Sequence, residues 1–311
     1  MIPILRVDSV TKYLGNQLVL DNLSMVIERP MIYGLLGPNG AGKSTLLSII
    51  VGVLEPDSGT VLVKGAEPLS PETRKSIGYC PQENGLIEHL SGYDNALFYG
   101  RLYGLESGAI IEEATRLGER LGLSKAVLRR KVSTYSGGMK RKLAIIISLL
   151  HDPELLVLDE PTTGLDPETR REVWSLLEEL RREGKAVVLA THYMEEADKL
   201  SDVVGIMDRG RLLAEGPPEE LKKRYGPKTV VELRLEEPPA REIVSELSSR
   251  YTRGVYAEED KLRLHIDDPE KIVPRILEDL YSKGYHVLEL RITRPTLEDV
   301  FLKLTGRRLR G

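Results

Sequence analysis

The sequence has little cysteine and no long hydrophobic run. Cys80 is the only cysteine in 311 residues, so no disulfide can form within the chain and nothing points to an oxidising compartment. No apolar stretch approaches the roughly 20 residues that a membrane-spanning helix requires. The N-terminus, MIPILRVDSV, becomes charged too soon to be a signal peptide. These absences predict a cytoplasmic protein that acts at a membrane only through a partner.

A basic charge excess is also missing. The formal net charge is −4 at pH 7, which argues against a dedicated nucleic-acid-binding protein. Hydrophobic residues make up 41% of the chain and charged residues 30%, which is enough to bury a core and keep the surface soluble. The length allows one large domain or two ordinary ones.

Residues 1–224 have the pattern of a parallel α/β core. The buried strand MIYGLLG leads into a glycine-rich loop and then a helix, KSTLLSIIVGVL. Helical periodicity dominates at about 83–150, after which two short apolar strands, ELLVLDEP and AVVLATH, flank a helix. The stretch VVGIMDRGRLLAEG predicts a hairpin turned at Arg209-Gly210.

A second domain is predicted at 227–311. A helix stops at Gly226-Pro227, and the following elements have the order β-α-β-β-α-β before a terminal helix, TLEDVFLKLTG. This order suggests a small ferredoxin-like α+β domain. It has no catalytic constellation, and we interpret it as a module that clasps a dimer or regulates activity. The basic end, Arg307 to Arg310, is interpreted as a solvated tail in preference to a lipid contact.

The stretch GPNGAGKST has the spacing of a phosphate-binding loop, G-x-x-x-x-G-K-[ST]. Its glycines let backbone N–H groups converge on phosphate oxygens, and the next helix adds its dipole. Lys43 supplies a positive charge at the β- and γ-phosphates of ATP, and Ser44 holds Mg²⁺. An accidental glycine turn is a poorer explanation because a strand precedes the loop and a helix follows it. The predicted nucleotide ligands in the loop are Gly37, Asn39, Gly40, Gly42, Lys43, Ser44 and Thr45.

Polar residues follow three of the predicted strands. Asp159 and Glu160 end LLVLDE, so that one carboxylate can bind the Mg²⁺ shell while the other polarises an attacking water. Alone, such a pair is more often a solvated end or a helix cap, but a phosphate loop in the same core reverses that preference. Gln82 follows SIGYC and is placed to reach the metal or the water. His192 follows AVVLAT, where an uncharged ring suits a γ-phosphate sensor.

A second glycine-rich stretch lacks a lysine. Ser136, Gly137 and Gly138 precede the helix LAIIISLL, so their N–H groups and the helix dipole can hold an anion. A plain serine N-cap is the alternative. Two glycines after a serine cap are costly unless something must approach the backbone closely.

Five motifs resemble those of the ATP-binding cassette (ABC) ATPases, in the same order: GPNGAGKST, PQENGL, YSGGM, LLVLDEPTTGLDP and LATHYMEEAD. The resemblance covers residues 1 to about 224. It implies that Ser136, Gly137 and Gly138 cap ATP held by the phosphate loop of a second subunit, in a homodimer or heterodimer. It also places Asp166, in GLDP, at the dimer seam.

The resemblance assigns catalytic roles as well. It makes Glu160 the catalytic base and His192 the γ-phosphate contact, and it puts Gln82 in the loop that links nucleotide to a transmembrane partner. The implied Mg²⁺ ligands are Ser44, Gln82 and Asp159.

Two departures from the common pattern are informative. Tyr135 and Met139 replace the usual Leu and Gln, and with PTLEDVFLKLTGR they resemble drug- and polysaccharide-export ATPases. The family also stacks an aromatic residue on adenine in a K-x-aromatic-G pattern, but here Tyr13 stands one position early and so faces the other side of a strand. Either a bulge restores Tyr13, or Leu14 packs on adenine. The bulge is our hypothesis.

The predicted function is the ATP-hydrolysing subunit of an exporter. It would lie on the inner face of the membrane through an integral-membrane permease, with no nucleic acid as partner. The segment Glu83 to Gly104 is the predicted permease groove, although its aromatics could equally form the core of the helical subdomain. Those aromatics are Tyr93, Phe98, Tyr99 and Tyr103.

Two other function classes remain open. A non-transport cassette ATPase acting on the ribosome or DNA normally has two cassettes or a long coiled coil, and this chain has neither. A nucleotide-gated binding module with little turnover is disfavoured by the intact Glu160.

Overall fold

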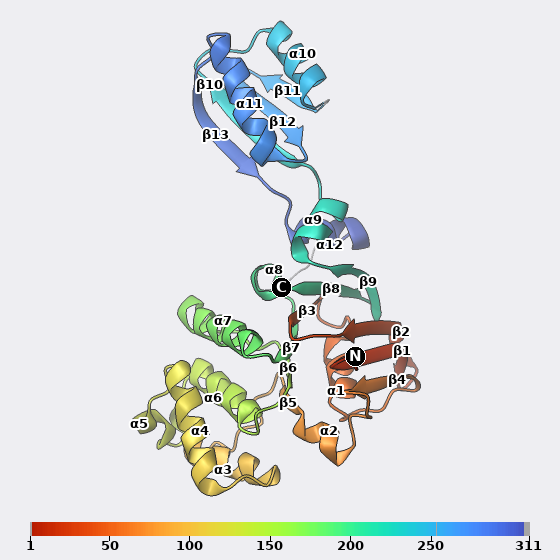
Figure 1. The fold of residues 1–311 in the computed structure, drawn as a ribbon, viewed down its shortest axis with the longest axis vertical. Helices are drawn as coiled ribbons and strands as arrows, with labels where there is room; N and C mark the ends of the chain where they lie inside the picture. The colour runs from red at the N-terminus through yellow and green to blue at the C-terminus, as the bar shows by residue number, and fades with distance from the viewer. Residues whose placement is uncertain (1, 253, 308–311) are drawn as a thin grey trace. The chain divides into compact units, whose positions relative to one another are not determined.

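The computed structural model describes residues 2–252 and 254–307. The chain divides into two compact units between Pro218 and Glu219 (Figure 1). The division falls at the start of helix α9 (Pro218–Tyr225), one helix before the predicted boundary, and the end of α9 lies against Pro295 of the second unit. Within the described residues no helix is long and apolar enough to cross a bilayer. The basic tail beyond Arg307 lies outside them.

A six-stranded sheet forms the centre of the first unit. Its order is β5-β6-β7-β3-β8-β9, and all neighbouring pairs are parallel except β8 with β9. Strands β3, β6 and β7 are entirely buried, as their continuous apolar sequences predict. The predicted parallel core is therefore present. The strands are β3 (Ile32–Leu36), β5 (Ile77–Cys80), β6 (Leu155–Asp159), β7 (Ala186–Thr191), β8 (Val203–Asp208) and β9 (Arg211–Gly216).

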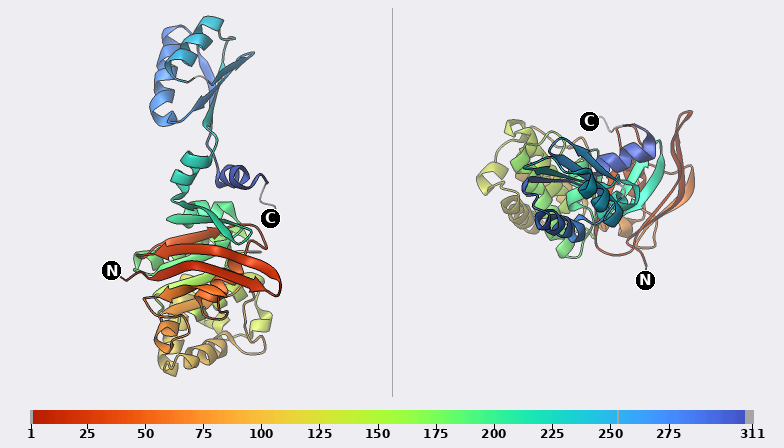
Figure 2. Two further views of the ribbon diagram at one scale, coloured as in Figure 1. Left: turned by 90° about the vertical axis from the view of Figure 1, so that its right-hand side faces the viewer. Right: turned by 90° about the horizontal axis from the view of Figure 1, so that it is seen from above.

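A second sheet of the first unit is antiparallel and has the order β2-β1-β4. Its strands are long and curved (Figure 2, left). Strand β1 buries Leu5, Val7 and Val10, because the register shifts between Val7 and Val10, where Ser9 has φ of 53°. The strands are β1 (Leu5–Leu14), β2 (Gln17–Ile27) and β4 (Ser58–Val63).

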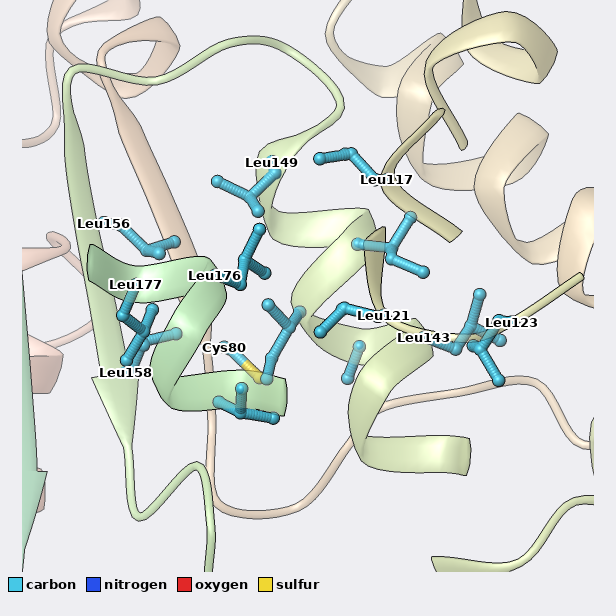
Figure 3. Close-up of a cluster of buried hydrophobic side chains, with 14 of the residues drawn as sticks. Cys80, Leu117, Leu121, Leu123, Leu143, Leu149, Leu156, Leu158, Leu176 and Leu177 are labelled. Atoms are coloured by element: carbon cyan, nitrogen blue, oxygen red, sulfur yellow. The ribbon is translucent and has the colours of Figure 1, made fainter. Parts of the chain in front are cut away.

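Most helices of the first unit lie within the predicted helical region. Leucines of α4, α6 and α7 pack with Leu156 and Leu158 of β6 around the buried Cys80 (Figure 3). This core fixes the start of α6 beside the ends of the parallel strands. The helices are α1 (Lys43–Ile50), α2 (Pro71–Lys75), α3 (Gly92–Leu102), α4 (Ser107–Arg120), α5 (Lys125–Leu128), the 3₁₀ turn η1 (Val132–Thr134), α6 (Gly137–Leu149), α7 (Pro167–Arg182) and α8 (Met194–Leu200).

The second unit has the predicted β-α-β-β-α-β order. Its antiparallel sheet has the order β11-β12-β10-β13, which is the ferredoxin-like arrangement. Helices α10 and α11 cover one face of the sheet (Figure 2, left), where apolar residues from both helices and from β10 and β12 form the core. The elements are β10 (Thr229–Leu235), α10 (Arg241–Arg250), β11 (Val255–Glu258), β12 (Lys261–Ile266), α11 (Pro269–Ser282), β13 (Val287–Thr293) and α12 (Leu297–Thr305).

Candidate functional site

The candidate residues follow four adjacent strands of the parallel sheet. Gln82 follows β5, Asp159 and Glu160 end or follow β6, His192 follows β7, and Lys43 lies in the loop and helix after β3. The carboxyl ends of parallel strands meet at one edge of a sheet, where open α/β proteins bind their ligands. The topology therefore brings four separate sequence segments to a single site.

The phosphate loop adopts a conformation that only glycine permits at Gly42. This residue has φ of 100°, and a Cβ atom there would lie 2.8 Å from the carbonyl oxygen of Val19. Gly42 precedes α1 without any side-chain cap, so the first N–H groups of the helix have no side-chain partner from Gly42. Asn39 and Gly40 at the loop tip are exposed, as is Ser44. The loop thus presents N–H groups and a helix N-terminus to a ligand.

The hairpin between β8 and β9 supports the same loop. Its turn residues, Arg209 and Gly210, have φ of 48° and 78°, as predicted for a tight hairpin turn. Gly210 donates its N–H to the carbonyl of Ala41 at 2.9 Å, and its own carbonyl accepts from the N–H of Asp21 at 3.0 Å. A Cβ atom on Gly210 would lie 2.3 Å from the carbonyl oxygen of Val19. One glycine therefore joins the phosphate loop to β2.

Lys43 is buried inside the loop. Only 5% of it is exposed, and Nζ donates to the carbonyls of Gly37 at 2.8 Å and Pro38 at 3.1 Å. The carboxylate of Glu160 lies 4.0 Å away. Burial lowers the pKa of Lys43, and the charges of Glu160 and Asp159 oppose that shift. The ammonium group is held by acceptors that a phosphate group can replace.

Asp159 is the most deeply buried carboxylate of the site. It is 2% exposed, and its Oδ1 atom is buried without a hydrogen-bond partner in the described part of the chain. Burial raises the pKa of Asp159, whereas a hydrogen bond with Ser44 lowers it. An unsatisfied carboxylate oxygen beside a hydroxyl group suits a hard cation, which prefers oxygen ligands. No group of three or more His, Cys, Asp or Glu residues could hold a metal alone among the described residues, which fits a cation that takes most of its ligands from phosphates and water.

Glu160 is the centre of the site. Its Oε1 atom lies 2.9 Å from Nδ1 of His192, and its Oε2 atom accepts from Nε2 of Gln82 at 3.4 Å and from the hydroxyl of Thr163 at 3.1 Å. Glu160 is 8% exposed and has φ of 49°, a conformation that costs free energy for any residue other than glycine. The three predicted catalytic residues, Glu160, His192 and Gln82, are therefore in mutual reach around one carboxylate.

The second glycine-rich stretch begins α6. The hydroxyl of Ser136 accepts from the N–H of Met139 at 3.2 Å, so the serine is an N-cap. Ser136 and Gly137 are exposed, and a Cβ atom on Gly137 would meet nothing within 4 Å. Tyr135 is buried, and its hydroxyl donates to the carbonyl of Val127 at 2.7 Å. The tyrosine anchors the motif, while its serine and first glycine face outwards.

Asp166 caps the next helix. Its Oδ1 atom accepts from the N–H groups of Glu168 and Thr169, both at 3.0 Å, at the start of α7. These backbone bonds, with Thr169 the larger contributor, hold the pKa of Asp166 below its usual range. A Cβ atom on Gly138 would lie 3.3 Å from the Thr169 side chain, so α6 and α7 begin next to each other.

The region around Tyr13 is irregular, as the bulge hypothesis requires. The register of β1 with β2 shifts on both sides of Lys12. Asp57 accepts from the N–H of Tyr13 at 2.6 Å and from Nζ of Lys12 at 3.0 Å. Tyr13 is 48% exposed and Leu14 is 49% exposed, so both side chains remain accessible to a ligand.

The aromatics of the predicted permease groove have different surroundings. Tyr93 packs against the helical core and its hydroxyl lies 2.8 Å from that of Thr115. Tyr99 and Tyr103 line a cavity of about 570 Å³ together with the exposed Leu102. Part of the set is therefore core, and part lines a surface cavity.

Arg141 is an important residue that sequence reasoning missed. It is 5% exposed on α6, and its guanidinium donates to the carbonyls of Pro81, Gln82, Asp159 and Pro161. One side chain thus connects α6 with the loop after β5 and the loop after β6. Its spacing of four residues before the buried Ile145 and seven before the buried Ser148 puts it on a buried helix face, which was the available signal.

Comparisons with known proteins give a consistent result over the whole chain. A family model described as ABC transporter matches residues 20–163, and one for the C-terminal domain of DrrA1-3-like ATP-binding proteins matches residues 216–305. The linearmycin resistance ATP-binding protein LnrL of Bacillus subtilis (strain 168) is 36% identical, with 98% of this chain and 99% of that protein covered. The Nod factor export ATP-binding protein I of Rhizobium sp. (strain N33) is 40% identical, with 96% of each chain covered.

A solved structure supports the same assignment. The ATP-binding subunit of an ABC transporter matches with a TM-score of 0.66 and 28% identity, over 72% of this chain and 93% of that one. The predicted fold class is confirmed. The chain therefore belongs to the ABC transporter family of ATP-binding proteins, and it is an ATPase with a DrrA-like C-terminal domain.

Proposed function

We propose that this chain is the ATP-hydrolysing subunit of an exporter for a hydrophobic or amphiphilic compound. The observation that carries the proposal is the cluster of Glu160, His192 and Gln82 next to Lys43. Full-length similarity to a linearmycin resistance protein and a Nod factor export protein favours export over action on the ribosome or DNA. The intact carboxylate cluster favours turnover over a binding module.

Each residue of the cluster has a proposed role in hydrolysis. Lys43 would leave the carbonyls of Gly37 and Pro38 to bind the β- and γ-phosphates of ATP. Glu160 would accept the proton of the attacking water, as a general base must lie within hydrogen-bonding reach of it. His192, which fixes one oxygen of Glu160, would also contact the γ-phosphate.

We further propose a Mg²⁺ ion with the nucleotide. Ser44, Asp159 and Gln82 would hold it, since the free Oδ1 of Asp159 and the hydroxyl of Ser44 are oxygen ligands. When bound, the ion would neutralise charge that develops on the phosphate oxygens.

A second ATP-binding subunit would complete the site, in a homodimer or a heterodimer. Ser136 and Gly137 are exposed at the N-terminus of α6, where N–H groups and the helix dipole suit an anion. They would cap the γ-phosphate of ATP bound by the other subunit. Asp166, at the neighbouring start of α7, would lie at the seam between the subunits.

The permease would dock at the cavity lined by Tyr99, Leu102 and Tyr103. Leu102 is 70% exposed and Val53, on the opposite wall, is 73% exposed. Large apolar side chains at such exposure mark an interaction site. This contact would place the chain on the inner face of the cell membrane without a spanning segment of its own.

The test is recovery of partners from detergent-solubilised membranes of the source cells. The wild-type chain should retain an integral-membrane protein that Leu102→Glu and Val53→Glu lose, while both variants keep wild-type ATPase activity. The matched control is Leu69→Glu, since Leu69 is also exposed but lies outside this cavity. Recovery of ribosomes or DNA in place of a membrane protein would disprove the exporter function.

A further inference from the structure

The outer edge of the C-terminal sheet exposes apolar side chains. Strand β13 ends the order β11-β12-β10-β13, and in the described part of the chain no strand pairs with its outer side. Ile292 pairs with the buried Val231 and Leu290 pairs with the buried Leu233, so both lie on the face covered by α10 and α11. Nevertheless, Leu290 is 42% exposed and Ile292 is 39% exposed. The apolar face therefore continues past the helices onto an uncovered strand.

The two edges of this sheet differ. Strand β11 at the other edge has four residues, whereas β13 has seven. A long edge strand presents a row of unpaired N–H and C=O groups that can pair with another strand. Proteins usually protect such an edge with lysine, proline or a covering segment, and β13 contains neither lysine nor proline. Of the two edges, β13 is therefore the better suited to accept a strand.

The charged residues of β13 alternate in sign on the opposite face. Glu289 lies 3.6 Å from the guanidinium of Arg234 and 3.3 Å from that of Arg291, and Arg291 pairs in register with Glu232. The strand thus carries one acid and one base on either side of Leu290.

We propose that β13 pairs antiparallel with β13 of a second copy of this chain, with the twofold axis at Leu290. Directly opposed residues of an antiparallel pair lie on the same face of the sheet. Both copies therefore keep their helices on one face only if the axis passes through a residue. The two four-stranded sheets would then form one continuous sheet without a free β13 edge.

Charge selects among the three central registers. An axis at Glu289 opposes two carboxylates, and an axis at Arg291 opposes two guanidinium groups, both of which are destabilising across a strand pair. An axis at Leu290 opposes Glu289 of each copy to Arg291 of the other and places the two Leu290 side chains together. The sequence of β13 is therefore complementary to itself in one register, and this favours a second copy over an unrelated partner.

Added cysteines can report the register directly. Leu290→Cys, Glu289→Cys and Arg291→Cys would each be introduced into the full-length chain, in which the native Cys80 is buried. Opposed residues of an antiparallel pair lie about 4.5–5.5 Å apart between Cα atoms, within the range of a disulfide. On mild oxidation without nucleotide, Leu290→Cys should form covalent dimers at least about tenfold faster than the other two. Dominant linkage at position 289 or 291, or no linkage above wild type at any position, would overturn the proposal.

Charge exchange gives an independent test in the Leu290→Cys chain. Glu289→Arg alone leaves two bases on the strand, and Arg291→Glu alone leaves two acids, so each variant should cross-link with itself at least about fivefold more slowly. An equimolar mixture should recover covalent heterodimers, because every base then opposes an acid. Failure of the mixture, with thermal unfolding showing that both variants are folded, would exclude this register. Because no nucleotide is added, the outcome is independent of the proposed ATPase cycle.

Discussion

The Nδ1 atom of His192 lies 2.9 Å from Oε1 of Glu160, although 32 residues separate them in the chain. The two residues follow β7 and β6, which are neighbours in the sheet. Gln82, which follows β5 on the other side of β6, approaches the second oxygen of the same carboxylate. Glu160 is thus held between the loops of the two adjacent strands.

Replacement of Glu160 by glutamine should abolish turnover and preserve nucleotide binding. A general base contributes about 10²–10⁴ to a rate, so phosphate release should fall at least about a hundredfold. The amide has nearly the same shape, so ATP affinity, measured with a fluorescent analogue, should change by less than about threefold. Glu154→Gln is the control, since Glu154 is an exposed acid paired with Lys64. Equal ATPase activity in wild type and Glu160→Gln would remove this carboxylate from the mechanism.

Arg141→Met should impair both stability and activity. The variant leaves buried carbonyls of the loops after β5 and β6 without their donor. Each unsatisfied buried acceptor costs about 1–3 kcal/mol, and a domain of this size loses about 2–4 °C of melting temperature per kcal/mol. We therefore expect a fall of several degrees by calorimetry and a lower kcat.

Two further variants define the role of Arg141. Arg129→Met removes an exposed arginine of the same subdomain and should leave both quantities unchanged. Arg141→Lys keeps the charge without the planar fork of donors and should recover only part of the stability. A melting temperature and kcat equal to wild type in Arg141→Met would contradict the bracing role.

Tyr13→Ala tests the adenine contact. A base stacked on an aromatic side chain gains about 1–3 kcal/mol, so ATP affinity should fall about five- to 150-fold in a titration. Leu14→Ala removes a side chain of similar exposure from the next position and should have a smaller effect. The reverse order would assign the adenine contact to Leu14, and unchanged affinity in Tyr13→Ala would show that Tyr13 does not stack.

Glu196 predicts a pH-dependent difference in stability. Its carboxylate is buried and accepts from the hydroxyl of Thr162 at 2.8 Å and from Nε1 of Trp174 at 3.1 Å. Burial raises the pKa of Glu196 above its ordinary value of 4.5, and the hydrogen bonds from neighbouring side chains only partly offset this. A raised folded pKa means that the stabilisation from the neutral carboxyl is complete below pH 4.5 and is lost as pH rises through the folded pKa.

Glu196→Gln should therefore be more stable than wild type at neutral pH, and the difference in melting temperature should shrink as pH falls towards 4.5. Glu195→Gln is the matched control, because the hydrogen bond from Lys199 lowers the pKa of the exposed Glu195. That variant should show no gain at neutral pH. A difference between Glu196→Gln and wild type that is independent of pH would rule out a titrating buried carboxyl.

Local sequence patterns predicted much of the first unit. The glycine spacing located the phosphate loop, the apolar run before Asp159 located a buried strand, and Arg209-Gly210 located a hairpin turn. In each case the signal lies within about ten residues, so turn chemistry and periodicity suffice.

Other features depend on contacts between distant segments. The left-handed backbone of Glu160, which brings its side chain to His192, has no glycine or asparagine to announce it. The alternation of β13 predicts a strand, but it cannot tell that the strand lies at an edge with Leu290 exposed. That property depends on which of the other strands pair with it.

The hairpin tip at Gly210 has a consequence for protein engineering. Exposed hairpin tips are usually the sites where tags, new termini or inserted domains are tolerated best. Here the tip glycine bonds to Ala41 and Asp21 and fits against Val19 with no room for a side chain. An insertion at this turn would displace the phosphate loop itself, so this surface turn is a poor place to cut or extend the chain.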